Sequence, residues 1–332
     1  MNPILRLSLT LVAVGYACSS LVVATGGFYV QNQEPDIGQK TQVTTDRTLE
    51  TTPTWSPDGQ FLYFVSDRFG GLGICRIERG GGGGVSAVTQ PAYDEVDVYP
   101  DVNPLNGEIA FASNRSRGIL QIWTVNPKAR GLTQLTNAPF GASFPSWSPD
   151  GKEIAFSARD KNGNVFVWIT NADGSNQRQL TQGTQPRWSP DGKRLVYAAI
   201  TQAQSRSYDI YTIEIASNAI SQITSDDSNE FQPDWSPDGR WLVYVSYKGR
   251  LTFGRSGREV TSDLRSKANF EIWIKDIMSP GRSSTQLTRS KGFDGWPRWT
   301  PKRHELVFTS DRSGSLDLWT MIPGGSVITG RP

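Results

Sequence analysis

The sequence predicts an all-β fold: a six-bladed β-propeller with four antiparallel strands in each blade. Three observations predict it. One short motif recurs at regular intervals, each copy is followed by segments with the composition of strands, and the repeat leaves no room for a helix. A repeat of about 40–50 residues is typical of propellers, so the repeat decides the architecture.

The recurring motif is Trp-Ser-Pro-Asp-Gly, present in four near-identical copies and two degenerate ones. A type I turn favours Ser at its first position, Pro at its second and Gly at its fourth, so the motif predicts a hairpin between the first two strands of a blade. The tryptophans, placed by the repeat, are expected to pack between neighbouring sheets. Successive anchor positions are 47, 45, 41, 47 and 64 residues apart. The anchors are Trp55, Val102, Trp147, Trp188, Trp235 and Trp299.

Three further segments follow each hairpin. In the first copy, "FLYFVSD" at 61–67 alternates in polarity, "GICRI" at 73–77 follows a short turn, and "AVT" at 87–89 closes the unit. Runs of β-branched and aromatic residues between Gly, Pro, Asn and Asp are strands. The other closing segments are at 134–136, 179–181, 222–224 and 286–288.

These are five closing segments for six blades, so the sixth must come from elsewhere. The segment "TQVT" at 41–44 ends 11 residues before Trp55, the same separation as from Thr136 to Trp147. We therefore expect this N-terminal strand to complete the last blade, which would remove an open sheet edge and close the ring. The segment "SVIT" at 326–329 is a competing candidate for the same place.

The N-terminal segment is predicted to be an export signal or a membrane anchor. Residues 7–30 contain no charged side chain, and Arg6 precedes them. The alternatives are a cleaved signal peptide ending at Ala17, a lipoprotein signal with Cys18 as the lipidated residue, and an uncleaved membrane helix. A fourth is an apolar strand in the core. The expected organisation is a signal or anchor at 1–30, a linker at 31–40 and the propeller at 41–332.

Composition excludes several classes of function. The 332 residues carry 34 basic and 32 acidic side chains, a balance that gives no basic stripe for nucleic acid. The only histidine, His304, and the two cysteines, Cys18 and Cys75, cannot build a zinc site of several His and Cys ligands. Cys75 takes a strand position held by Trp or Tyr in other copies, which favours burial in the core.

The repeats resemble those of the TolB β-propeller family. The resemblance rests on "WSPDG" together with "FTSDRSGSLDLWTM" at 308–321 and "FVSDR" at 64–68, and it covers residues 41–323. Similar repeats occur in the propellers of prolyl oligopeptidases, the tricorn protease and oligogalacturonate lyases. The resemblance implies a protein-docking platform in the bacterial envelope. TolB proteins also carry an α/β domain before the propeller, for which the segment 31–40 leaves no room.

Two functions follow as hypotheses. The first is a non-catalytic, monomeric propeller that docks a protein or peptide partner, either periplasmic or tethered to the membrane by its N-terminal segment. The alternative is a carbohydrate-active or glycan-binding propeller of the envelope. No Gly-x-Ser-x-Gly nucleophile motif is present, and one histidine cannot supply a histidine-rich metal site, so the sequence favours a protein that is not an enzyme.

The candidate site is the mouth of the channel. Three residues before the proline of each motif, four of the six copies carry an acid, which predicts carboxylates around one opening. Such a ring would attract a Lys or Arg of a partner or a hard cation, with Ca²⁺ at Asp97, Glu230 and Asp294. The alternative is that each acid caps its own loop. The acids and the aromatic residues beside them are Glu50, Asp97, Tyr99, Phe144, Glu230, Phe231, Asp294 and Trp296.

A second candidate is the basic insertion at 249–268, which explains the spacing of 64 residues. It is expected to join the second and third strands of the fifth blade, on the same face as the acids. An acidic partner or an anionic envelope polymer would fit it; the alternative is a solvated loop without a partner. Its basic residues are Arg250, Arg255, Arg258, Arg265 and Lys267.

Overall fold

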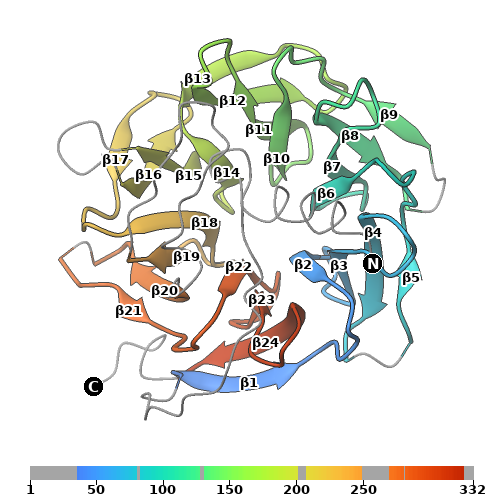
Figure 1. Cartoon of the computed structure of the whole chain (residues 1–332). Coiled ribbons are helices and arrows are strands. Elements are labelled where there is room, and N and C mark those ends of the chain that lie inside the picture. Colours follow the sequence, from blue (N-terminus) through green and yellow to red (C-terminus); the bar gives the residue numbers. More distant parts are fainter. Residues whose placement is uncertain are drawn as a thin grey trace.

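The computed structural model describes residues 36–80, 83–127, 131–200, 207–248, 269–279 and 281–324. These residues form six four-stranded antiparallel sheets arranged as a ring around a central axis (Figure 1). The described residues contain strands and turns but no α-helix. The predicted six-bladed all-β propeller is therefore confirmed.

Each blade runs from an innermost to an outermost strand. The first blade holds β2 (Glu50–Trp55), β3 (Phe61–Ser66), β4 (Gly73–Glu78) and β5 (Ser86–Ala87), and the second holds β6 (Asp97–Val102), β7 (Ile109–Ser113), β8 (Gln121–Val125) and β9 (Leu132–Gln134). The third holds β10 (Ala142–Trp147), β11 (Glu153–Arg159), β12 (Val165–Asn171) and β13 (Arg178–Gln182), and the fourth holds β14 (Thr184–Trp188), β15 (Arg194–Ile200), β16 (Tyr208–Glu214) and β17 (Ile220–Gln222). The fifth holds β18 (Asn229–Trp235), β19 (Trp241–Tyr247), β20 (Phe270–Asp276) and β21 (Thr285–Gln286), and the sixth holds β22 (Asp294–Trp299), β23 (Leu306–Ser310), β24 (Asp317–Pro323) and β1 (Gly38–Gln42).

The sixth blade is closed by the N-terminal strand, as expected from the spacing. Strand β1 pairs antiparallel with β24, from Gly38 opposite Pro323 to Gln42 opposite Trp319 (Figure 1). The strand begins at Gly38, three residues before the segment 41–44 that the sequence pointed to. The competing segment 326–329 lies outside the described residues.

In five of the six blades, the threonine that ends the closing segment has a separate role. Thr44 lies beyond β1, and its hydroxyl oxygen accepts a hydrogen bond of 2.9 Å from the backbone N–H of Leu318 in the third strand. The same contact recurs in four other blades, which explains why the segments share a threonine. The other acceptors are Thr89, Thr136, Thr224 and Thr288, and their donors are Ile74, Ile122, Ile210 and Ile272.

The Ser-Pro-Asp-Gly segments form the predicted hairpin turns. In the first blade the Gly59 N–H donates to the Ser56 carbonyl at 2.9 Å, and Gly59 has a φ of 72°, which glycine adopts without strain. The Ser56 hydroxyl accepts the N–H of Phe61 at 2.9 Å and donates to Asp58 at 2.5 Å. The motif is therefore a self-contained hydrogen-bonded corner.

The tryptophans before the turns pack between neighbouring blades. Trp55 is buried in a cluster that combines Phe64 and Cys75 of the first blade with Val307 and Leu318 of the sixth. Burial raises the pKa of the Cys75 thiol to about 12, so this cysteine is a packing residue.

The predicted signal or anchor at 1–30 and most of the predicted linker lie outside the described residues. In the part of the chain that the structure describes, no helix has the length and apolar character needed to cross a membrane.

Candidate functional site

A strained position recurs in the innermost strand of all six blades. The residue before the motif's proline has a positive φ, and the pairing with the second strand shifts register there in every blade. Non-glycine residues in this region cost about 1–3 kcal/mol each and persist only where the surrounding fold holds them. The residues are Thr52 (49°), Tyr99 (58°), Phe144 (56°), Gln185 (57°), Gln232 (54°) and Trp296 (54°).

All six of these residues line one pocket at the centre of the ring. The pocket leaves about 410 Å³ of empty space, part of it open to solvent. Three aromatic rings pack on one another in its wall: Tyr99 lies 4.1 Å from Phe144 and 5.5 Å from Trp296, measured between ring centroids. Five of the motif's prolines complete the lining, so the pocket is mainly apolar.

The two glutamines hold the neighbouring bulges in place. The Gln185 side-chain oxygen accepts the backbone N–H of Gln232 at 2.8 Å, and the Gln232 oxygen accepts the backbone N–H of Trp296 at 2.6 Å. These contacts satisfy backbone donors that the bulge removes from the ladder. The sequence analysis missed both glutamines, although the column before the proline, in which they stand, was visible in the repeat.

A layer of charges lies two residues further along the innermost strands, nearer the hairpin turns. Arg187 reaches across to Asp101 with a distance of 2.6 Å between Nη1 and Oδ1, and Arg298 lies 3.4 Å from Asp234. Because two arginines face two aspartates, this layer has little net charge to offer a ligand. None of these four residues was predicted from the sequence as a site residue.

The two aspartates of this layer also accept backbone N–H groups of the next blade, from Trp147 at 2.7 Å to Asp101 and from Trp299 at 2.9 Å to Asp234. Burial raises the pKa of both carboxyl groups, that of Asp234 to about 7, although Arg187 acts in the opposite direction. Their oxygens are engaged in holding neighbouring blades together.

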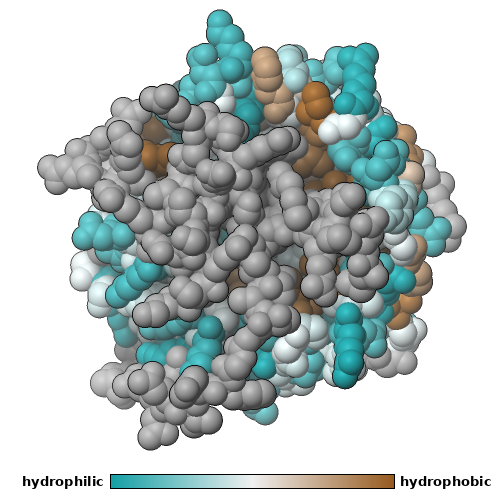
Figure 2. Space-filling model, viewed as in Figure 1, coloured by the Kyte–Doolittle hydropathy of each residue, from teal (hydrophilic) through white to brown (hydrophobic). Residues whose placement is uncertain are grey.

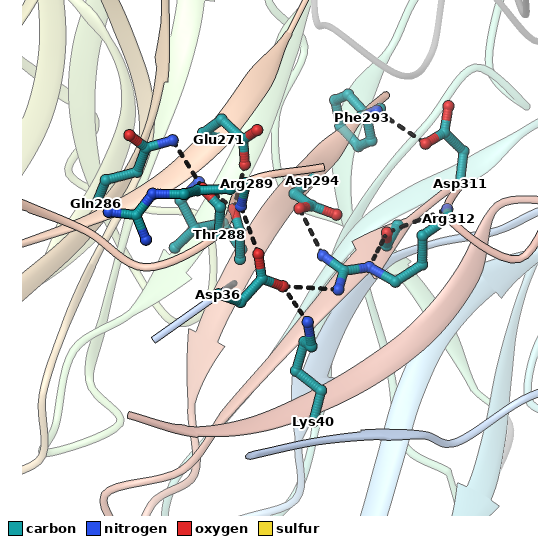
Figure 3. A network of polar contacts seen from close by, with 12 residues as sticks. Asp36, Lys40, Glu271, Gln286, Thr288, Arg289, Phe293, Asp294, Asp311 and Arg312 are labelled. Carbon is teal, nitrogen blue, oxygen red and sulfur yellow. Dashed lines mark hydrogen bonds and ion pairs between the residues drawn. The ribbon is translucent and has the colours of Figure 1, made fainter. Parts of the chain in front are cut away.

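The acids predicted around the opening lie instead in the junctions between blades, where all four are buried. Three of them bind the arginine that follows 18 residues later in the same blade, at the start of the loop between the second and third strands. The pairs are Glu50 with Arg68, Asp97 with Arg115, and Asp294 with Arg312. Arg312 also binds Asp36, so the last pair belongs to a larger network (Figure 3).

Glu230 differs from the other three acids. The residue 18 positions later is Lys248, which is exposed. Burial, with Asp226 and Asp209 nearby, raises the pKa of the Glu230 carboxyl to about 9. Burial also raises the pKa values of Glu50 and Asp294, but there Arg68 and Arg312 act in the opposite direction. Among the described residues no group of three or more His, Cys, Asp or Glu side chains gathers to hold a metal ion, and Asp97, Glu230 and Asp294 are not brought together for Ca²⁺.

The four predicted aromatic site residues lie in two different places. Tyr99, Phe144 and Trp296 meet in the central pocket, whereas Phe231 packs against Tyr208 of the fourth blade at 4.9 Å between ring centroids. Gln232 holds the pocket position of the fifth blade. The candidates Cys18, Arg250, Arg255, Arg258, Arg265 and Lys267 lie outside the described residues.

A second hollow adjoins the central pocket through Phe144. It lies where the third blade meets the fourth, and its lining comes from the starts of β10, β12 and β14 and the end of β11. It combines apolar carbon, hydroxyl groups and one guanidinium. Its lining is Phe140, Gly141, Ser143, Phe144, Ser157, Ala158, Arg159, Val165 and Thr184.

Comparison with protein families fits this architecture. The family model of the tricorn protease N-terminal β-propeller domain matches residues 120–329, more than half of the chain. The chain belongs to this propeller family. The TolB β-propeller domain model matches residues 26–185, so the predicted relationship to TolB-like propellers is confirmed as well.

Individual relatives of this propeller are distant. The uncharacterized protein Atu1656 of Agrobacterium fabrum is 33% identical over 86 residues, which is 26% of this chain and 28% of that relative's length. A putative TolB from Agrobacterium tumefaciens has a similar structure, with a TM-score of 0.64, 19% identity and coverage of 84% of this chain and 92% of that one.

Two further solved structures share the fold. TolB from Acinetobacter baumannii gives a TM-score of 0.57 at 18% identity, covering 82% of this chain and 63% of that one. An oligogalacturonate lyase in complex with manganese gives 0.56 at 17% identity, covering 86% and 80%. At these identities the likeness shows the fold alone.

Proposed function

We propose that this propeller is a non-catalytic docking protein of the bacterial cell envelope, whose central pocket binds a protein or peptide partner. The observation that carries the proposal is the pocket itself. Every blade contributes one residue in a strained conformation, half of these residues are aromatic, and the lining is mainly apolar. Apolar pockets with a few placed polar groups are the usual binding sites of proteins.

The polar groups around the pocket support docking over catalysis. The glutamine oxygens accept backbone N–H groups, and the aspartates are bound to arginines and to the backbone. A general base or a nucleophile would need to be within reach of a substrate, and these groups are engaged in the scaffold. His304 lies in the hairpin turn of the sixth blade, edge-on to Trp299 at 6.1 Å.

The proposed location rests on the uncharged segment at 7–30, which favours export, and on the TolB-like repeats. We place the propeller in the periplasm or tethered to the membrane by its N-terminal segment, as a monomer. Strand β1 completes the sixth blade, so the last blade has the same four strands as the other five.

Glycan binding is the alternative, and one observation favours it. An aromatic wall with amide side chains nearby also suits sugar rings, and one similar structure is an oligogalacturonate lyase. Among the described residues no group of three or more His, Cys, Asp or Glu side chains gathers that could hold a metal ion.

The test compares a pocket variant with a control on the opposite face. Phe144→Ala enlarges the central pocket, while Leu105→Ala changes an exposed side chain in a hairpin turn. After cross-linking and affinity purification from the native host, wild type and the Leu105 variant should capture the same protein, and the Phe144 variant should lose it at least tenfold. A wild-type protein that captures no protein but retains oligosaccharides on a glycan array would replace docking by the alternative.

A further inference from the structure

The second hollow is bordered by exposed apolar side chains. Phe140 is 48% exposed and Ile119 is 38% exposed. The two lie close together, because a Cβ atom placed on Gly141 would be 3.4 Å from Ile119 Cγ2. Hydrophobic side chains also reach the surface over the second and third blades in the upper right of Figure 2. The surface formed by this hollow, Phe140 and Ile119 is called the blade 3 surface below.

The third blade carries no acid at the repeat position that holds one in the first, second, fifth and sixth blades. In the first blade Glu50 faces Ser66 across the two inner strands; in the third, Ala142 faces Ala158 at the same place. Two methyl groups here replace a carboxylate and a hydroxyl. Ala142 is buried in the core, whereas Ala158 lines the hollow together with Thr184 of the fourth blade.

The charge at this place is positive. Arg159 lines the hollow, and its Nη1 donates to the Gly163 carbonyl at 3.3 Å, which orients the guanidinium. Lys161 and Arg117 are exposed on the loops beside it. The acid of the same loop, Asp160, accepts three hydrogen bonds within that loop, at 2.8, 2.9 and 3.0 Å. The field around the hollow therefore favours a negative group.

We propose that the blade 3 surface binds an acidic side chain, Asp or Glu, from an extended segment of the docked partner. The carboxylate enters the hollow beside Arg159, and an apolar neighbour in the same segment packs on Phe140 and Ile119. Because Phe144 lines both pockets, the segment continues from the central pocket across the third blade. A charge-assisted contact at a half-buried arginine adds specificity to the apolar anchor. This inference rests on the proposed docking function.

The test first maps the segment that lies on this surface. A photo-reactive benzoyl-phenylalanine replaces Phe140, with the same residue at Leu105 as the control, and mass spectrometry identifies the cross-linked segment. We expect one segment from position 140 with an Asp or Glu within two residues of an apolar side chain, and no such product from position 105. No cross-link at 140, or a segment without an acid, overturns the inference.

The mapped segment is then synthesised, and its binding is measured by fluorescence anisotropy. Arg159→Glu should weaken binding at least tenfold, and replacing the peptide's acid by Lys should restore binding to that variant. Arg178→Glu, at an exposed arginine on β13, should stay within twofold of wild type. An Arg159 variant that binds like wild type overturns the inference.

The two proposals fail in distinguishable ways. If the Phe144 variant no longer captures the partner while position 140 yields no cross-link, the docking function is supported and the acidic contact at the blade 3 surface is contradicted. If neither the central pocket nor position 140 selects a partner, both proposals fail.

Discussion

Two junctions between blades carry different residues at the same repeat positions. They are the junction between the fifth and sixth blades and the junction between the fourth and fifth blades. In the first, Arg312 donates to Asp294 at 2.6 Å and to Asp36 at 2.8 Å, so two buried acids share one guanidinium (Figure 3). In the second, Glu230 occupies the place of Asp294, and the place of Arg312 is held by the exposed Lys248.

The difference shows how a repeat specialises its junctions. Asp36 precedes the closing strand, and its second oxygen accepts the backbone N–H of Arg289 at 2.6 Å (Figure 3). Burial acts to raise the pKa of Asp36, but hydrogen bonds from Lys40, Arg312 and Arg289 together lower it. The junction with Arg312 therefore fastens the end of the ring, and Arg312 opposes the rise in the pKa of Asp294 that burial causes. In the other junction, burial raises the pKa of Glu230 to about 9.

The largest effect is expected for Arg312→Ala. It leaves the carboxylates of Asp36 and Asp294 buried without their shared cation, and breaking a buried ion pair from one side costs about 3–5 kcal/mol. Urea unfolding should show a loss of about 3 kcal/mol, since Arg312 is partly exposed. Arg178→Ala, which removes an exposed pair with Glu153, serves as the control and should change stability by less than about 1 kcal/mol. Equal losses in both variants would contradict a fastening role.

A smaller effect, and one that depends on pH, is expected at Glu230. Because its pKa is raised to about 9 in the folded protein, the folded state keeps a proton that the unfolded chain releases above its ordinary pKa. Stability from this group is present at low pH and is lost as pH rises towards 9. Glu230→Gln removes that loss, so its melting temperature should rise relative to wild type between pH 5 and pH 9.

The matched variant is Asp97→Asn in the junction between the first and second blades. Arg115 Nη2 lies 2.6 and 2.5 Å from the two oxygens of Asp97, so this change removes the negative charge that pairs with Arg115. It should destabilise the protein by about 2 kcal/mol at pH 7. If Glu230→Gln destabilises as much as Asp97→Asn at that pH, the two junctions do not differ in the way described.

The architecture was predictable because it repeats. The separation of 11 residues from Thr44 to Trp55 predicted ring closure, and hairpin chemistry predicted the turns. The lining of the central pocket was predictable in part: Tyr99, Phe144 and Trp296, predicted from their place beside the acids, line it, whereas Phe231 precedes the pocket position of its blade by one residue and packs on Tyr208. The bulge decides which residue faces the pocket, and a bulge shifts the side-chain alternation that sequence reasoning assumes.

The fate of the acids was harder to predict. An acid and the arginine 18 residues later meet only because the second strand returns antiparallel beside the first. The "SDR" triplets were used as evidence of family resemblance, and their arginines were not matched to the acids. Exposure at the channel mouth was therefore expected for side chains that the fold buries between blades.

The smallest effect tests whether the missing arginine alone explains the contrast. Lys248→Arg places a guanidinium 18 residues after Glu230, the offset at which Arg68, Arg115 and Arg312 reach their acids. A nearby cation lowers the pKa of a buried carboxyl, so the variant should gain about 1 kcal/mol of stability at pH 8 and lose less stability than wild type between pH 5 and pH 9. Urea unfolding at several pH values measures both, with the exposed Lys193→Arg as the control that should match wild type. Lys248→Arg could instead keep the wild-type dependence of stability on pH. The backbone at position 248 would then lie too far from Glu230 for an arginine to reach it, and the difference between the two junctions would not be explained by the residue type.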